Sequence, residues 1–207
     1  MPKRGLFIVF EGIDGCGKST QVWKVAKYIA EQNKYNHVLV TREPYQKKEI
    51  REILKKNEAP HTQAEELANL FLEDRKKHLN ELIIPALEKG VWVISDRYKF
   101  STIAYQAAQG LKTENLINMH KGLIISDITF IIDLPAEIAK ERISLENRKD
   151  GEQKFEKSLQ FQEKVRQNYL ELKNTHEKEN IVIIEGNQDV EKIFEEIKLH
   201  LNNLITN

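Results

Sequence analysis

The chain has 207 residues, the length of one domain, and its single cysteine, Cys16, excludes an intrachain disulfide. Lysine plus arginine and aspartate plus glutamate both number 32, so the formal net charge is zero and a global basic field for nucleic acid is excluded. The first apolar run covers only residues 6–10 and no run reaches about 18 residues, so we expect a cytoplasmic protein without a membrane span.

Short apolar runs alternate with longer helical patterns along the chain. The runs predicted as strands are Leu6–Phe10, His37–Thr41, Val91–Ser95, Ile128–Asp133 and Asn180–Ile184. The predicted helices are Lys18–Gln32, Lys47–Lys56, Gln63–Glu88, Lys99–Gln109, Glu114–Leu123, Pro135–Leu145, Phe155–His176 and Asp189–Leu201. The connections are long enough for right-handed crossovers. We therefore expect a single α/β domain over residues 1–207, a doubly wound five-stranded parallel sheet with helices on both faces.

The segment between the first strand and the first helix carries a phosphate-binding motif. Its sequence GIDGCGKS, residues 12–19, fits G-x-x-x-x-G-K-[ST]. Glycines let backbone N–H groups turn toward phosphate, and the helix that follows favours an anion at its N-terminus. Lys18 can reach the β- and γ-phosphates, and the Ser19 hydroxyl can ligate Mg²⁺. The motif predicts a P-loop NTPase-type fold that binds ATP or GTP, but it does not separate a kinase from a GTPase or an ATPase.

A second polar segment follows the third predicted strand and begins with Asp96 and Arg97. In doubly wound sheets, ligands bind at the carboxyl ends of the strands, where this segment lies. Asp96 can hold a metal-bound water, and Arg97 can clamp a phosphate with its bidentate fork. Taken alone, the segment fits equally well an aspartate that caps an ordinary amphipathic helix.

Together, these motifs resemble the thymidylate kinase family of P-loop nucleoside monophosphate kinases. The matching segments are the loop Phe10–Gln21, Thr41–Pro44, Leu70-Phe71 with Arg75, and Asp96–Gln106. The resemblance implies transfer of the γ-phosphate of ATP to dTMP, giving dTDP and ADP in dTTP synthesis. It also implies Mg²⁺ as the cofactor and a homodimer, with no nucleic-acid or membrane partner. The alternatives are a kinase for dUMP or UMP, and a nucleotide-binding switch that performs no transfer.

The resemblance assigns ATP and dTMP to separate sets of residues. The residues expected to bind ATP are Gly12, Ile13, Asp14, Gly15, Cys16, Gly17, Lys18, Ser19 and Thr20. The residues expected to bind dTMP are Asp14, Arg42, Arg51, Phe71, Arg75, Arg97, Ser101, Thr102 and Tyr105. Phe71 is expected to stack on the pyrimidine, although the spacing of its helix also fits core packing. Arg75 lies one helical turn later and is expected to donate to the base O4.

The remaining assignments follow the same resemblance. Ser101 or Thr102 is expected to read the base edge, and Tyr105 to fill the space under the sugar. Asp14 is expected to accept from the 3′-hydroxyl. Arg97 is expected to hold the acceptor phosphate together with Arg42 or Arg51, and the sequence leaves open which. Ser19 and Asp96 are the expected metal contacts.

The polar stretch Glu141–Lys157 is interpreted as a basic lid at residues 142–156. One group of thymidylate kinases keeps a catalytic arginine in the phosphate loop, and another has glycine there with basic residues on the lid. With Gly15 in the loop, this chain resembles the second group, although such a stretch is often only a solvated charge run. The expected catalytic residues are Lys18, Arg97, Arg148 and Arg142, with Lys149 beside them and Arg142 alternatively an anchor for the lid. The six histidines show no metal-ligand spacing and are predicted to lie on the surface.

Overall fold

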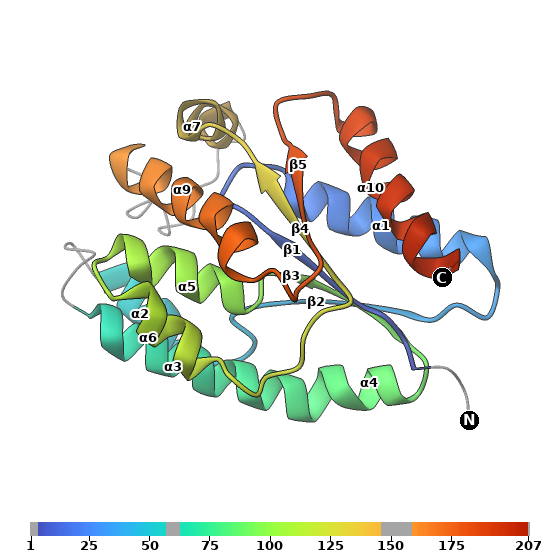
Figure 1. The fold of residues 1–207 in the computed structure, drawn as a ribbon, viewed down its shortest axis with the longest axis horizontal. Helices are drawn as coiled ribbons and strands as arrows, with labels where there is room; N and C mark the ends of the chain where they lie inside the picture. The colour runs from blue at the N-terminus through green and yellow to red at the C-terminus, as the bar shows by residue number, and fades with distance from the viewer. Residues whose placement is uncertain (1–3, 57–62, 146–158, 207) are drawn as a thin grey trace.

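The computed structural model describes residues 4–56, 63–145 and 159–206, and its centre is a single five-stranded sheet (Figure 1). The strands are β1 (Phe7–Glu11), β2 (Val38–Arg42), β3 (Trp92–Asp96), β4 (Ile128–Asp133) and β5 (Ile181–Glu185). Every neighbouring pair is parallel, and the order across the sheet is β2-β3-β1-β4-β5. The predicted doubly wound parallel sheet is confirmed.

Helices cover both faces of the sheet, with α1 and α10 on one face and α3, α4, α5 and α9 on the other (Figure 1). The helices are α1 (Lys18–Gln32), α2 (Lys48–Lys56), α3 (Ala64–His78), α4 (Ile84–Glu88), α5 (Lys99–Ala108), α6 (Thr113–Met119), α7 (Ala136–Leu145), α9 (Leu159–Thr175) and α10 (Val190–Thr206). The long connections that carry these helices are what a parallel sheet requires.

Side chains on β1 are buried on both faces, as an unbroken apolar run predicts for a central parallel strand. Phe7 and Val9 pack in one cluster with Leu79 from the α3–α4 side. Ile8 and Phe10 belong to the larger cluster, which includes the buried faces of α1 and α10. The alternation follows from the period of two in a strand. The strand order puts β1, and so the loop that follows it, at the middle of the sheet.

The segment predicted as one helix, Gln63–Glu88, is interrupted by a π-helical turn, η1 (Leu79–Ile83). Pro85 at the start of α4 explains the interruption. Proline has no N–H, and its ring collides with the carbonyl four residues earlier in an α-helix. The wider π turn makes room for that ring while the chain stays helical.

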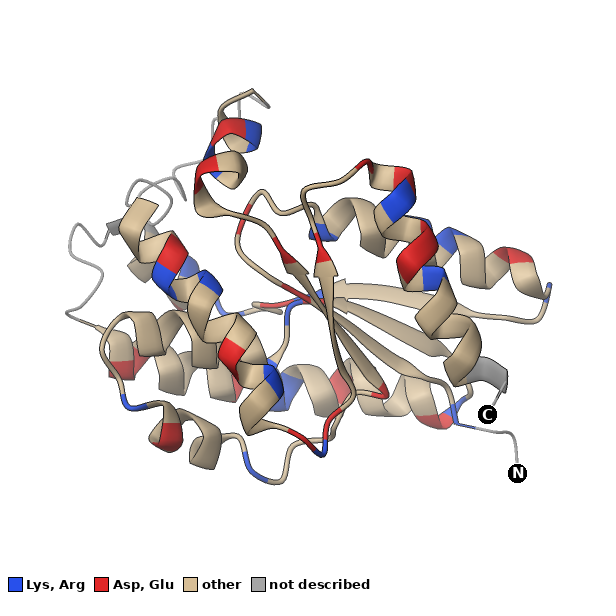
Figure 2. Cartoon of the chain, turned by 45° about the horizontal axis from the view of Figure 1, so that its top comes forward, with Lys and Arg blue, Asp and Glu red and all other residues tan. Residues whose placement is uncertain are grey.

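Charges of both signs are interspersed over the helices, and acidic residues mark strand ends (Figure 2). The strand-ending carboxylates are Glu11 of β1, Asp96 of β3, Asp133 of β4 and Glu185 of β5. Parallel strands bring these ends to one edge, so this edge has to be neutralised by cations. In the described ranges, no helix combines the length and apolarity that crossing a membrane needs.

Candidate functional site

The loop between β1 and α1 has a backbone that only glycine adopts easily at several positions. Gly12 has φ 136°, and a Cβ there lies 2.6 Å from the Ile132 carbonyl oxygen. Gly15 has φ 80°, and a Cβ there lies 2.6 Å from the Ala139 carbonyl oxygen. Because α7 packs directly on the loop at Gly15, an arginine at this position cannot be accommodated unless the helix moves.

Lys18 is buried, and its ammonium group is bound inside the loop. Its Nζ donates to the carbonyl oxygens of Gly12 at 3.0 Å and of Ile13 at 2.8 Å. Helix α1 begins at Lys18, and no side chain caps its N-terminus at Gly17. The free N–H groups and the lysine charge therefore meet at one point, which is the arrangement that binds a phosphate.

The hydroxyl of Ser19 donates to Asp96 Oδ2 at 2.9 Å, joining the start of α1 to the end of β3. Hydroxyl, carboxylate and water oxygens are the ligands that Mg²⁺ prefers. Among the described residues, no three His, Cys, Asp or Glu side chains gather into a metal cage. The Ser19 hydroxyl and the Asp96 carboxylate are nevertheless oxygen ligands of the kind that suits Mg²⁺.

Cys16 belongs to the phosphate loop, and its side chain is fully buried. Its Sγ is 3.7 Å from Lys18 Nζ, but burial outweighs this nearby charge and raises the pKa of the thiol. Thiolate is the reactive form of cysteine, so the buried thiol is expected to be inert. The geometry therefore favours an inert, space-filling role for the Cys16 side chain.

Arg97 lies between the phosphate loop and α5 and has a left-handed backbone with φ 77°. Such a conformation costs free energy for a non-glycine residue and tends to occur at functional sites. The Ser95 hydroxyl donates to the Arg97 carbonyl at 2.7 Å, which helps to hold it. The guanidinium forms an ion pair with Asp14 and donates to Ser101 Oγ at 3.0 Å. It also reaches the hydroxyl of Tyr105 at 3.4 Å.

The Asp14 carboxylate, in the phosphate loop, accepts hydrogen bonds from Arg97 and Tyr105, which both follow β3. Burial raises its pKa, but the charges of Arg97 and Lys18 outweigh that effect and bring the pKa to about 2. Asp14 is therefore ionised at neutral pH, and it accepts from Tyr105 at 3.4 Å. The structure brings Asp14, Arg97 and Tyr105 together, as expected from the resemblance.

Glu11 is a buried carboxylate that holds the start of α5. Its Oε1 accepts from the Tyr98 amide at 2.9 Å, and its Oε2 accepts from Ser101 Oγ at 2.6 Å and Tyr169 OH at 3.1 Å. Burial raises its pKa. Neither Glu11 nor Tyr169 was predicted to belong to the site, although the acidic residue directly after the apolar run Leu6–Phe10 was a visible signal.

Arg75 is buried at 1% exposure and pairs with Glu43 from the loop after β2. Its Nε donates to Glu43 Oε2 at 2.7 Å, and its NH2 donates to Thr102 Oγ1 at 3.1 Å. Thr102 accepts from Arg75 and keeps its own hydrogen to donate, whereas the Ser101 hydroxyl is engaged by Glu11. Of the two residues open for the base edge, the geometry favours Thr102. Phe71, one turn before Arg75, is half-buried.

Asp74 fixes the loop that follows β2. Its buried carboxylate accepts the backbone N–H groups of Tyr45, Gln46 and Lys47, the last two at 2.9 and 2.8 Å. Tyr45 stacks on His78 with ring centroids 4.4 Å apart. Helix α3 therefore positions this loop as well as contributing Phe71 and Arg75. The role of Asp74 was not anticipated.

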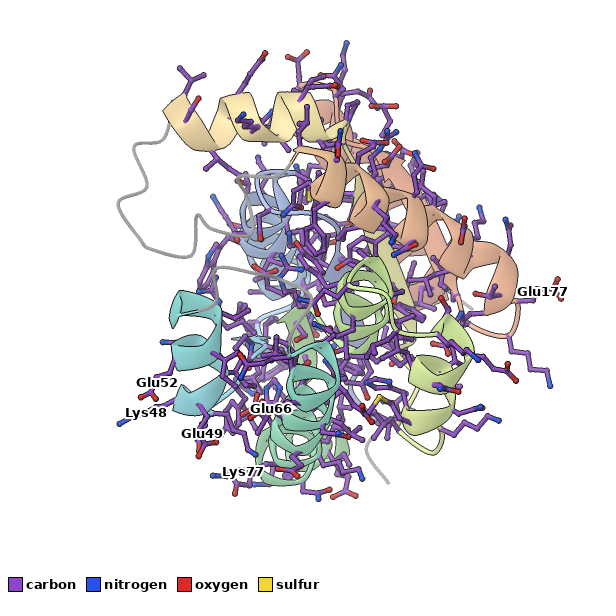
Figure 3. The ribbon with its side chains drawn as sticks, turned by 90° about the vertical axis from the view of Figure 1, so that its left-hand side faces the viewer. Lys48, Glu49, Glu52, Glu66, Lys77 and Glu177 are labelled. Atoms are coloured by element: carbon purple, nitrogen blue, oxygen red, sulfur yellow. The ribbon has the colours of Figure 1, made fainter. Side chains whose placement is uncertain are left out.

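The two arginines expected near the acceptor phosphate differ in place. Arg42 ends β2 and is exposed, with its NH2 3.8 Å from Asp96 Oδ2. Arg51 is exposed on α2, whose charged residues Lys48, Glu49 and Glu52 point away from the molecule (Figure 3). The structure therefore brings Arg42 to the strand ends.

The basic lid expected at residues 142–156 is covered by the structure only in part. Arg148, Lys149 and most of the segment 142–156 lie outside the described residues. Arg142 lies on α7 and donates to the Gly186 carbonyl at 3.2 Å, so it ties α7 to the connection after β5.

The prediction that the histidines lie on the surface is wrong for His78 and His120, which are buried. Each has a polar partner that satisfies it: His78 contacts Thr41 Oγ1 at 2.8 Å, and His120 contacts Arg75 at 2.7 Å. His37 is exposed, and His176 and His200 are half-buried. His61 lies outside the described residues.

Comparisons with known proteins agree on one family. The family model described as thymidylate kinase matches residues 10–197. The chain is 39% identical to a thymidylate kinase of Carboxydothermus hydrogenoformans, over 97% of this chain and 98% of that protein. It is 39% identical to a probable thymidylate kinase of Pyrococcus abyssi, over 94% of each chain. A thymidylate kinase of Thermosipho africanus is 39% identical, over 93% of this chain and 96% of its own length.

The contact between Gly15 and α7 predicts a difference between two glycine variants. Both Gly15→Ala and Gly17→Ala put an alanine into a left-handed backbone conformation, which should lower the free energy of unfolding by about 1–2 kcal/mol. Only Gly15→Ala forces a Cβ against the Ala139 carbonyl, since a Cβ at Gly17 meets nothing within 4 Å. Thermal unfolding should therefore give a lower Tm for Gly15→Ala than for Gly17→Ala. Equal Tm values would contradict the direct packing of α7 on the loop.

The burial of Cys16 predicts slow alkylation of the native protein. Iodoacetamide at pH 8 should modify the thiol much more slowly in the folded protein than in urea, because the sulfur is covered and its raised pKa keeps thiolate scarce. ATP with Mg²⁺ should leave the native rate unchanged. Fast native alkylation that ATP–Mg²⁺ prevents would show instead that the thiol faces the phosphates.

Proposed function

The chain belongs to the thymidylate kinase family, and we propose that the edge formed by the ends of β1, β2 and β3 is its site for phosphoryl transfer from ATP to dTMP. The protein is a phosphotransferase that converts dTMP to dTDP. The observation that carries the site assignment is the ion pair between Asp14 of the phosphate loop and Arg97 of the acceptor segment. This ion pair joins the loop that is expected to bind ATP to the segment that is expected to bind dTMP. The family assignment does not favour a dUMP or UMP kinase, or a switch without catalysis.

The donor half of the site consists of the loop at residues 12–19 and Thr20. Lys18 is already held by carbonyl oxygens, and we propose that it exchanges one of them for a β- or γ-phosphate oxygen of ATP. Ser19 and Asp96 would hold Mg²⁺, the ion that these kinases generally use. Bound Mg²⁺ neutralises the charge that develops on the phosphate oxygens.

The acceptor half lies between α3 and α5. Arg75 offers only hydrogen-bond donors, which suit the O4 acceptor of thymine and repel the amino group of cytosine. Thr102 can add a hydroxyl donor at the same edge. Phe71, half-buried on the face of α3 that carries Arg75, supplies an aromatic surface for the ring. Tyr105 and Asp14 form the sugar side, where Asp14 can accept from a 3′-hydroxyl.

Phosphoryl transfer needs the two phosphates to be held in line. Arg97 is positioned for the acceptor phosphate by Asp14, Ser101 and its own left-handed backbone. Arg42 or Arg51 would add a second positive charge. A phosphate monoester dianion is itself a nucleophile, so alignment and charge neutralisation supply most of the catalysis and no general base is required.

Assembly and location rest on the family alone. We propose that the protein works as a homodimer in the cytoplasm, as the resemblance implies. Sedimentation of the purified chain would test the first point: a single species with the mass of one chain at micromolar concentration would contradict a dimer.

The acceptor assignment predicts an order of substrates in an assay of ADP release. dTMP should be the best acceptor. dUMP should be weaker but measurable, because a missing methyl is worth about 1–3 kcal/mol. The ribose analogue of dTMP should be weaker still, because Tyr105 lies under the sugar. If CMP or AMP outcompetes dTMP, the base pocket is wrongly assigned; ADP release that no acceptor increases would remove the kinase function altogether.

Arg97→Lys should damage the acceptor side of the reaction. The variant keeps the charge but loses the planar fork, so a charged hydrogen bond worth about 1.5–3 kcal/mol is lost. We expect kcat/KM for dTMP to fall roughly ten- to a hundredfold while KM for ATP stays constant. Arg4→Ala is the matched control, because Arg4 pairs with Asp127 at the opposite end of the sheet. Equal losses for both substrates would mean that Arg97 only supports the fold.

A further inference from the structure

The donors of Arg75 are almost fully used by the protein. A guanidinium has five N–H donors in a rigid plane. Nε donates to Glu43 Oε2 at 2.7 Å, and the two hydrogens of NH2 go to the Tyr98 carbonyl at 3.0 Å and to Thr102 Oγ1 at 3.1 Å. NH2 also lies 2.6 Å from Glu43 Oε2 in the ion pair. NH1 donates to His120 Nε2 at 2.7 Å. Within the described ranges, only the second hydrogen of NH1 has no assigned acceptor.

The protonation state of His120 follows from its two neighbours. Its Nδ1 lies 2.7 Å from the Leu116 carbonyl oxygen, which can only accept, so Nδ1 carries the hydrogen. Nε2 then has a lone pair and accepts from Arg75. Burial, and after it the charge of Arg75, lowers the pKa of His120 to about 3, so the ring is neutral under all working conditions.

His120 follows the last residue of the short helix α6 and is 4% exposed. It contacts NH1 of Arg75, whereas Glu43, in the loop after β2, contacts Nε and NH2. Glu43 holds the Nε and NH2 edge of the guanidinium, and His120 holds NH1. Because NH2 is also bound to the Tyr98 carbonyl and to Thr102, these contacts together set the direction of the remaining NH1 hydrogen.

We infer that His120 is a positioning residue for base selection, which orients Arg75 so that its remaining NH1 hydrogen meets the O4 of a pyrimidine base. The inference rests on the proposed function, in which Arg75 reads that oxygen. Without an acceptor at Nε2, both hydrogens of NH1 lack a protein acceptor, so the hydrogen that meets the base is no longer set by the other. The contrast between a 4-oxo and a 4-amino pyrimidine should then fall, because the donor no longer opposes an amino group at a fixed place.

Two amide variants separate this role from capping of α6. The amide of His120→Gln reaches the place of Nε2 and can accept from Arg75. The amide of His120→Asn reaches only the place of Nδ1 and can donate to the Leu116 carbonyl. If His120 only caps the helix, asparagine should be the better replacement; if it orients Arg75, glutamine should be.

The measurement is kcat/KM for dTMP divided by kcat/KM for dCMP, obtained on the same enzyme preparation. Because both values share one enzyme concentration, a partly folded variant still gives a valid ratio. We expect His120→Gln to keep the wild-type ratio within about threefold and His120→Asn to lower it about tenfold or more, a loss of one charged hydrogen bond. KM for ATP should not change in either variant.

His200→Phe is the control, because His200 is half-buried on α10, where its ring lies 6.3 Å from that of Phe130. The inference is overturned if His120→Asn keeps the wild-type ratio of dTMP to dCMP, or if both variants lower that ratio equally. It is also overturned if KM for ATP changes as much as KM for dTMP. A wild-type enzyme that releases no ADP with dTMP would instead refute the proposed function.

Discussion

The hydrogen-bonded register of the three strands β2, β3 and β1 is the constraint on which the site depends. Asp96 at the end of β3 is paired with Arg42 on one side and with Phe10 on the other. Because parallel strands end at the same edge, the phosphate loop after β1, the loop after β2 and the acceptor segment after β3 leave the sheet in one row. The order β2-β3-β1-β4-β5 puts β1 at the middle of the sheet with β3 beside it. The connections after these two strands lead to α1 on one face and to α5 on the other, so a ligand can sit between them (Figure 1).

The second constraint is that charges buried at this edge need partners. An isolated buried charge costs several kcal/mol, about as much as the whole margin of stability of many domains. Arg75 is matched by Glu43, and Arg97 by Asp14. The pairs therefore hold the cationic groups in place before any nucleotide arrives, which is the preorganisation that stabilises charge in a transition state. The left-handed backbone of Arg97 fits the same explanation, because this strained conformation places the guanidinium at the site before a nucleotide binds.

Much of the fold was predictable because its signals are local. The five strands are short apolar runs, and the phosphate loop is a continuous motif whose glycines have no substitute at this backbone. The π turn before Pro85 was missed, since a proline within a helical pattern does not say how the helix absorbs it. The roles of Asp74 and His120 were also missed. Both depend on side chains that meet across the fold, as Arg75 and His120 do over 45 positions, and spacing along the chain carries no sign of such contacts.

We propose that the site at the ends of β1, β2 and β3 transfers the γ-phosphate of ATP to dTMP. The most direct measurement follows the group itself: ATP labelled in its γ-phosphate is incubated with dTMP, Mg²⁺ and the purified protein, and the labelled products are separated. We expect the label in the β-phosphate of dTDP, with one ADP formed for each dTDP and little free phosphate. Label that appears only as inorganic phosphate, at a rate that dTMP does not change, would contradict this proposal.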